Sequence, residues 1–188
     1  GRYLNDGSFG ITGDCKEISP EEVELLENHK FEEIRTLFWR NSNLNFNNPI
    51  SLIKSLEEKP QVEWLRKIHE CEDEKALKYF LKDQKILNKE FDKKTLMLLW
   101  ECCQIPDFVK KTYGNHFEVI GNVFKFLTSK KGLISEDYMR LQLMKLDKLD
   151  GNVDSLSNRI ANVRTWSYVS NKNNWVENQS YWIEKTKH

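Results

Sequence analysis

Arginine, lysine and aromatic residues are interleaved near the carboxyl end of this sequence, in a mixture that could bind nucleic acid. The residues concerned are Arg159, Arg164, Trp166, Tyr168, Lys172, Trp175, Trp182 and Lys187. Aromatic rings can stack on bases, and cationic side chains can pair with phosphates. The alternative is an aromatic stripe in the core with solvated basic residues on the other face. Leu156, Ile160 and Val163 recur at helical spacing and favour this alternative for the apolar positions.

No other group of residues forms a recognisable active site. The four histidines fit no zinc spacing, and they are His29, His69, His116 and His188. His69, Glu70 and Cys71 are adjacent, but three consecutive side chains of a regular helix cannot converge on one ion. Gly7, Gly10 and Gly13 match no phosphate-binding loop, so we expect a short strand or turn there. The sequence has no G-x-S-x-G and no Cys–His protease signature. We therefore predict no metal site and no complete active site.

The composition indicates a folded chain without a membrane span. The 188 residues include six Trp and ten Phe, enough large apolar side chains to build a core. Apolar runs such as Leu96–Trp100 are far shorter than the roughly 20 residues of a transmembrane helix. The 29 basic and 29 acidic residues cancel. The segment 14–33 is acidic, and the segments 107–131 and 151–188 are mildly basic. Solvated helix faces are enough to explain both biases.

Cysteine usage favours a reducing compartment. The four cysteines are Cys15, Cys71, Cys102 and Cys103, and no C-x-x-C motif occurs. Neighbouring side chains diverge by about 100° on a helix, so Cys102 and Cys103 are poorly placed to bond to each other. With no cysteine framework we expect a cytoplasmic protein.

Most of the elements that position these residues are predicted to be helices. Ser19-Pro20-Glu21-Glu22 predicts a helix start, as does Ser135-Glu136-Asp137. Further helices are expected over 49–58, 72–82, 95–103, 117–127 and 156–169 and around 175–183, whereas 31–40 fits neither strand nor helix cleanly. Inward-facing positions are expected to include Ile50, Tyr138, Leu141, Met144, Leu156 and Ile160. The predicted class is mainly α, a helical bundle-like region with a short extended segment at the N-terminus.

Several segments together resemble one protein family. Residues 152–172 read NVDSLSNRIANVRTWSYVSNK. Further short segments that match the same family lie at 2–13, 27–29, 37–42, 99–107, 174–175 and 181–187. In combination they resemble the C-terminal region of a DExH-type, superfamily-two helicase family. That family is typical of alphaproteobacteria and is similar to the RNA helicase of the mitochondrial degradosome.

The resemblance implies a division of the chain and a role for one arginine. Residues 1–18 would be a remnant of the second RecA-like domain, 19–149 a helical region and 150–188 a C-terminal helical segment. Gly1-Arg2 would end helicase motif VI, whose last arginine acts on the ATP γ-phosphate, so Arg2 is the one catalytic candidate. The parent would use ATP and Mg²⁺ held between two RecA-like domains. This chain has no P-loop lysine and no DExH carboxylates, so we expect no cofactor and no ATP hydrolysis by the chain alone.

The implied function is that of an accessory domain of an ATP-dependent RNA helicase in RNA unwinding and turnover. Its expected partners are RNA, with DNA as a further substrate, the RecA-like helicase core and an exoribonuclease, with no membrane. We expect backbone contacts to nucleic acid from Lys110, Lys111, Arg159, Arg164 and Lys172, since a motor must move along any sequence. The alternative is a helical protein-interaction module that docks a partner such as an exoribonuclease without binding nucleic acid.

Overall fold

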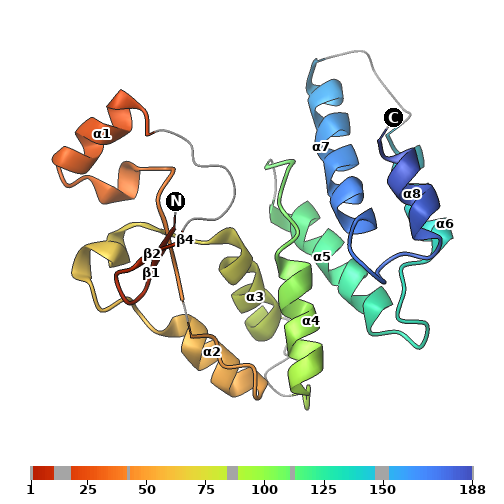
Figure 1. Cartoon of the computed structure of the whole chain (residues 1–188), viewed down its shortest axis with the longest axis horizontal. Helices are drawn as coiled ribbons and strands as arrows, with labels where there is room; N and C mark the ends of the chain where they lie inside the picture. The colour runs from red at the N-terminus through yellow and green to blue at the C-terminus, as the bar shows by residue number, and fades with distance from the viewer. Residues whose placement is uncertain are drawn as a thin grey trace. The chain divides into compact units, whose positions relative to one another are not determined.

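The computed structural model describes residues 2–10, 18–41, 43–83, 89–110, 113–146 and 153–187. The described residues form eight α-helices, two short 3-10 helices and four short strands, which confirms the mainly α class (Figure 1). The chain divides into two compact units, Gly1–Met97 and Leu98–His188, and the boundary falls within α4 (Lys93–Cys103). The divisions expected after residues 18 and 149 rest on the family resemblance and stay predictions.

The first unit contains a four-stranded sheet. Its strands are β1 (Arg2–Leu4), β2 (Phe9–Gly10), β3 (Phe38–Arg40) and β4 (His69–Glu70), in the order β2-β1-β3-β4. The β1–β2 pair is antiparallel, and β1 with β3 and β3 with β4 are parallel. The sequence predicts extended structure only near the N-terminus, but β3 and β4 lie further along the chain. Strands of two or three residues are too short to show the alternation of apolar and polar residues that predicts a strand.

The turn between β1 and β2 is built by short-range polar contacts. The Asp6 carboxylate accepts hydrogen bonds from the Ser8 backbone N–H (2.9 Å) and hydroxyl (2.7 Å). Gly7 has φ +85°, a conformation that favours glycine. The expectation of a strand or turn is confirmed for residues 7–10, and Gly13 lies outside the described residues.

The core of the first unit gathers residues from the ambiguous segment 31–40. That segment splits into η1 (Phe31–Glu33), a connection and β3, so it contains both helical and extended structure. Its buried side chains are Ile34, Leu37 and Trp39. They pack with Leu65 of η2 (Glu63–Lys67) and with Ile68. The irregular spacing of apolar residues follows from this change of conformation within ten residues.

Three helices complete the first unit: α1 (Pro20–Glu27), α2 (Pro49–Glu57) and α3 (Glu72–Asp83). The predicted helix start at Ser19 is confirmed, since its hydroxyl accepts a 3.2 Å hydrogen bond from the Glu22 N–H. The predicted apolar face of α3 is buried, and it comprises Ala76, Leu77, Phe80 and Leu81. Ile50 was expected to face inward but is 56% exposed, because Leu52 supplies the buried contact in its place.

The second unit contains the end of α4 with α5 (Tyr113–Leu127), α6 (Glu136–Met144), α7 (Val153–Ser170) and α8 (Gln179–Lys185). The predicted cap at Ser135 is confirmed, because its hydroxyl accepts from the Tyr138 N–H at 3.3 Å. The segment before α6 pairs with the segment before α8, where Ile134 N–H donates to the Trp175 carbonyl at 2.7 Å. Among the described helices, none has both the length and the apolar content needed to cross a membrane.

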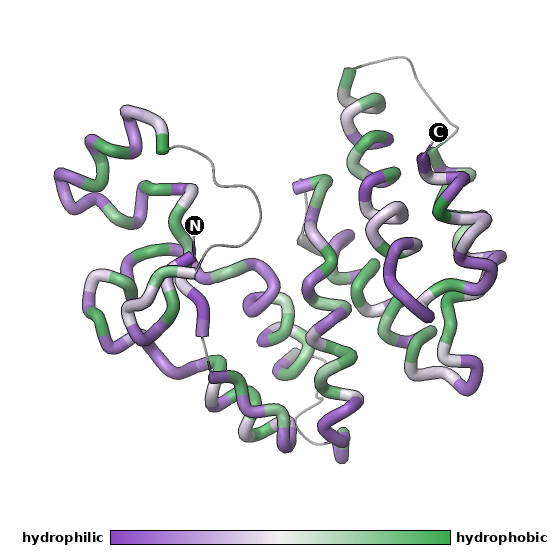
Figure 2. Tube along the Cα trace, viewed as in Figure 1, coloured by the Kyte–Doolittle hydropathy of each residue, from purple (hydrophilic) through white to green (hydrophobic). Residues whose placement is uncertain are grey.

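The inward face of α7 differs from the predicted one. Leu156 and Ile160 are 52% and 48% exposed, while Ala161, Thr165 and Val169 are buried. Those three recur every four residues, and the centre of their face lies about 140° from Ile160 around the helix. Leu141 and Met144 of α6 are also exposed, at 53% and 58%. Hydrophobic residues recur on more than one side of these helices (Figure 2), so periodicity alone does not identify the buried side.

Candidate functional site

Two of the predicted nucleic-acid contacts, Arg159 and Arg164, line a groove in the second unit. The groove has a volume of about 1070 Å³ and is formed by α6, α7 and α8. Its basic lining residues are Arg140, Arg159, Arg164 and Lys185, and its acidic lining residue is Glu184. The helices α7 and α8 run side by side in this unit (Figure 1), so residues separated by about 20 positions meet at one surface.

Many of the groove's lining residues are apolar. We call these residues the floor of the groove, and they are Leu143, Met144, Leu146, Leu156, Ile160, Val163 and Trp182. The exposed parts of Met144, Leu156 and Ile160 lie in this lining, so their exposure is concentrated in one place rather than scattered. The site thus combines an aliphatic surface with a surplus of positive charge.

Most of the positive charge that lines the groove has no strong ion pair among the described residues. Arg140 lies 3.4 Å from the Asp137 carboxylate, but both side chains are well exposed and such pairs are weak. No hydrogen bond or ion pair within the described part of the chain engages the side chains of Arg159, Arg164 or Lys185. These three cations are therefore available to an acidic ligand.

The aromatic residues beside the groove belong mostly to the core. Trp166, Trp175 and Trp182 are at most 4% exposed, so they cannot stack on bases. Tyr181 is 49% exposed and packs edge-on against Trp182, with ring centroids 4.8 Å apart. The core-stripe interpretation therefore describes the tryptophans better than the base-stacking interpretation.

Lys172 is engaged by its own chain. Its Nζ lies 5.2 Å from the centroid of the Tyr168 ring and 5.8 Å from that of Trp175, a cation–π arrangement. A phosphate would have to compete with both rings for this ammonium group. Lys172 does not line the groove, and it is placed less favourably for an external anion than Arg159 or Arg164.

The remaining predicted contacts lie elsewhere. Lys110 follows α4, is exposed and has φ +54°, and its backbone N–H donates to the Asp107 carboxylate at 3.0 Å. Lys111 lies outside the described residues. Lys110 is not part of the groove, so the structure brings together two of the five predicted residues.

Arg2, the residue carried over from the helicase resemblance, lies in the first unit at a charged cluster. Its Nη1 is 3.8 Å from Oδ2 of Asp73, the same oxygen that pairs with Arg40. Asp73 is 12% exposed, so two cations from parallel strands share one nearly buried carboxylate at the start of α3. This arrangement ties the sheet to α3.

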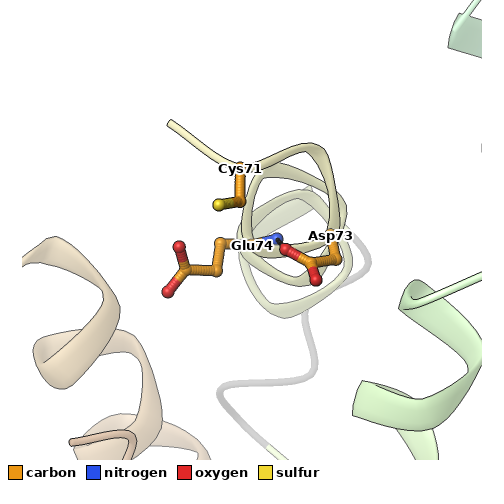
Figure 3. A group of neighbouring side chains, drawn as sticks. All are labelled: Cys71, Asp73 and Glu74. Carbon is orange, nitrogen blue, oxygen red and sulfur yellow. Dashed lines mark hydrogen bonds between the residues drawn. The ribbon is translucent and has the colours of Figure 1, made fainter. Parts of the chain in front are cut away.

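Cys71, Asp73 and Glu74 form the one grouping of potential metal ligands in the described residues, with ligand atoms within 4.8 Å of one another. Figure 3 shows the Asp73 carboxylate at the Glu74 backbone nitrogen, from which it accepts a 2.8 Å hydrogen bond. Burial raises the pKa of the Cys71 thiol to about 11, and this thiol donates to the Trp39 carbonyl at 3.1 Å. A cation would have to displace the thiol proton and the guanidinium groups of Arg2 and Arg40. The donor set is therefore a poor metal site.

Glu74 is the most perturbed carboxyl group of the cluster. Its side chain is fully buried, and burial raises its pKa from 4.5 to about 7. Its Oε1 accepts a 3.0 Å hydrogen bond from the Asn41 N–H, and its Oε2 has no hydrogen-bond partner among the described residues. The Asn41 amide in turn accepts from Asn5 and donates to the Leu56 carbonyl. The Glu74 carboxyl group therefore has a structural role where β3, α2 and α3 meet.

Comparisons with protein-family models, curated proteins and solved structures give no match. Sequence reasoning missed Arg140 and Lys185, which join the groove from α6 and α8, because their contribution depends on how three helices pack. It also missed Asp73 and Glu74, although consecutive acids at a helix start are common and signal little by themselves.

Proposed function

We propose that the chain is the C-terminal accessory region of a DExH-type RNA helicase and contacts RNA through its second unit. The observation that carries the proposal is the meeting of two segments of the family resemblance in one sheet. Arg2, Tyr3 and Leu4 pair in parallel register with Phe38, Trp39 and Arg40. Parallel pairing of this kind is typical of α/β domains such as the RecA-like fold. It extends beyond the remnant expected at residues 1–18, because β3 lies at Phe38–Arg40.

In this proposal the helices after the sheet form a bundle-like accessory region beside the motor. The parent protein would supply the ATP and Mg²⁺ site, since this chain has no P-loop lysine and no DExH carboxylates. Arg2 would be the last arginine of motif VI, and it lies 3.8 Å from the Asp73 carboxylate. The buried thiols of Cys71 and Cys102 agree with a reducing, cytoplasmic location.

RNA contact would come from cations that the chain leaves without a partner. Arg159 and Arg164 meet this requirement among the described residues, and exposed Lys110 is a further candidate. Lys172 would contribute less because two aromatic rings already face its ammonium group. Contacts to phosphates alone would be independent of sequence, as a translocating motor requires.

A salt titration of RNA binding tests the proposal. The 188-residue chain is mixed with a fluorescein-labelled 20-nucleotide uridine RNA, and fluorescence anisotropy gives the affinity between 50 and 300 mM KCl. The slope of the logarithm of the association constant against the logarithm of the salt concentration is about −0.7 per phosphate contact on single strands. Two or more contacts therefore predict a slope of about −1.4 or steeper. Lys130→Glu is the control, because Lys130 is exposed in the same unit and lies outside the groove. Absence of binding, or binding that is independent of salt, would contradict the proposal.

The second candidate function is a helical protein-interaction module without nucleic-acid binding. The apolar floor of the groove favours it, since contiguous exposed apolar side chains mark interaction sites. The same titration separates the two functions, because this candidate predicts no RNA binding.

A further inference from the structure

The groove between α6, α7 and α8 carries an apolar stripe between cationic side chains. On α7, Leu156, Ile160 and Val163 follow one another at intervals of four and three residues and form one stripe. At about 100° per residue, Arg159 lies about 60° to one side of Leu156 and Arg164 about 80° to the other. The apolar stripe is thus flanked by a cation on each side.

The neighbouring helices repeat this arrangement. Arg140 of α6 and Lys185 of α8 also line the groove, next to the apolar side chains of Met144 and Trp182. The charged residues that line the groove are three arginines and one lysine against one glutamate. A ligand that matches this surface must present an apolar stripe with negative charge on both sides.

We propose that this groove binds an acidic amphipathic helix of a partner protein. A helix with apolar residues at positions i, i+4 and i+7 presents a stripe of the same length as that on α7. Aspartate or glutamate on either side of that stripe would lie opposite Arg159 and Arg164. Charge complementarity of this kind guides association and fixes the orientation of the bound helix.

Single-stranded RNA would use the arginines of this surface but not its apolar floor. Binding of single strands combines phosphate contacts with stacking of bases on aromatic rings. Among the described lining residues, Tyr181 alone presents an exposed aromatic ring, since Trp182 is 2% exposed. The rest of the floor is aliphatic, and it gains most from burial against apolar side chains. Arg159 and Arg164 are common to both proposals, so RNA and the acidic helix would compete for them. The helix proposal survives if the RNA titration fails.

The probe for the test is a synthetic 18-residue peptide labelled with fluorescein. It carries leucine at i, i+4, i+7 and i+11, glutamate on both flanks and alanine elsewhere. Binding to the 188-residue chain is followed by anisotropy at 50 mM KCl. We expect saturable binding that weakens as salt rises. A peptide with lysine in place of every glutamate is expected to bind at least about tenfold more weakly.

Variants of the floor give the decisive readout because they change no charge. Ile160→Ser and Leu156→Ser are expected to weaken peptide binding by about tenfold each, as fits the loss of one buried aliphatic side chain. Both side chains are half exposed, so the fold should tolerate the change, and circular dichroism checks it. Ile50→Ser is the matched control, since Ile50 is 56% exposed on α2. RNA binding should be unchanged in all three variants, which separates this proposal from the proposed function.

Three results would overturn the proposal. Equal binding of the acidic and basic peptides would remove the charge argument. Unchanged peptide affinity in both Ile160→Ser and Leu156→Ser would place the peptide elsewhere. Light scattering that finds a dimer which Ile160→Ser dissociates would show that a second copy of the chain covers the groove.

Discussion

The backbone N–H of Asn41 donates a 3.0 Å hydrogen bond to Oε1 of Glu74, a carboxyl group without solvent exposure. This bond joins the end of β3 to the first turn of α3. The same carboxyl group has a pKa of about 7, raised mainly by burial. A structural contact of the first unit is therefore coupled to pH in the neutral range.

Stability of the first unit should fall as pH rises through the pKa of Glu74. Because the folded pKa is about 7 and the ordinary value is 4.5, the folded state holds more protons between these values. The contribution is therefore fully present below about pH 4.5 and is lost as pH rises to 7. Glu74→Gln should remove this slope, which is at most roughly 1.4 kcal/mol per pH unit. Urea unfolding of both proteins from pH 5 to 8 measures it, and parallel pH profiles would contradict the assignment.

Removal of the Asp73 charge should destabilise the first unit. Asp73 pairs with Arg40 and lies 3.8 Å from Arg2, so Asp73→Asn removes the negative charge that these two partly buried cations share. We expect a loss of roughly 1–3 kcal/mol in the free energy of unfolding. Asp137→Asn is the control, because Asp137 is 94% exposed and its pair with Arg140 should contribute under about 0.5 kcal/mol. Equal effects of the two changes in urea unfolding would refute the inference.

Gln179 should stabilise the junction of α7 and α8. Its Nε2 donates to the carbonyl oxygens of Ser170 and Lys172, both at 3.0 Å, at the carboxyl end of α7. Gln179→Ala should cost about 1–2 kcal/mol, and Gln179→Glu more, because it replaces a donor by a negative charge at that helix end. Thermal unfolding measures both changes. Gln61→Glu, at an exposed position of the first unit, controls for the added charge, and a Gln179→Glu variant as stable as wild type would exclude this role.

Lys172 should matter for stability more than for RNA affinity. Lys172→Ala removes a cation that faces Tyr168 and Trp175, at an expected cost of about 0.5–1 kcal/mol. Arg164→Ala removes a cation without a partner among the described residues, so it should weaken RNA binding more than Lys172→Ala does. Fluorescence anisotropy of both variants shows which one loses more RNA affinity, and thermal unfolding shows which one loses more stability. The reverse order in RNA affinity would place Lys172 at the RNA.

Much of the helical framework follows from local sequence signals. Ser19 and Ser135 begin α1 and α6 as their capping patterns indicate, because N-cap hydrogen bonds are made within four residues. The buried face of α3 was also predictable from its apolar spacing. Information of this kind is local, and it holds wherever one side of a helix is plainly more apolar than the other.

The buried side of α7 and the pairing of the strands were not predictable in this way. Leu156 and Ile160 are more hydrophobic than Thr165, yet Thr165 is the buried one, because close packing favours small side chains on that face. The strands β3 and β4 are two or three residues long and are stabilised by partners distant in sequence. Of the candidate site, sequence reasoning identified Arg159 and Arg164 but not the apolar floor between them.

Photo-crosslinking of RNA tests the central claim most directly. A 20-nucleotide RNA that contains 4-thiouridine is crosslinked to the 188-residue chain, and the modified peptides are mapped by mass spectrometry. The account predicts crosslinks within Leu98–His188, reduced in an Arg159→Glu, Arg164→Glu double variant and unchanged in Lys130→Glu. Crosslinks confined to Gly1–Met97, or none at RNA concentrations that saturate a known RNA-binding control protein, would contradict it.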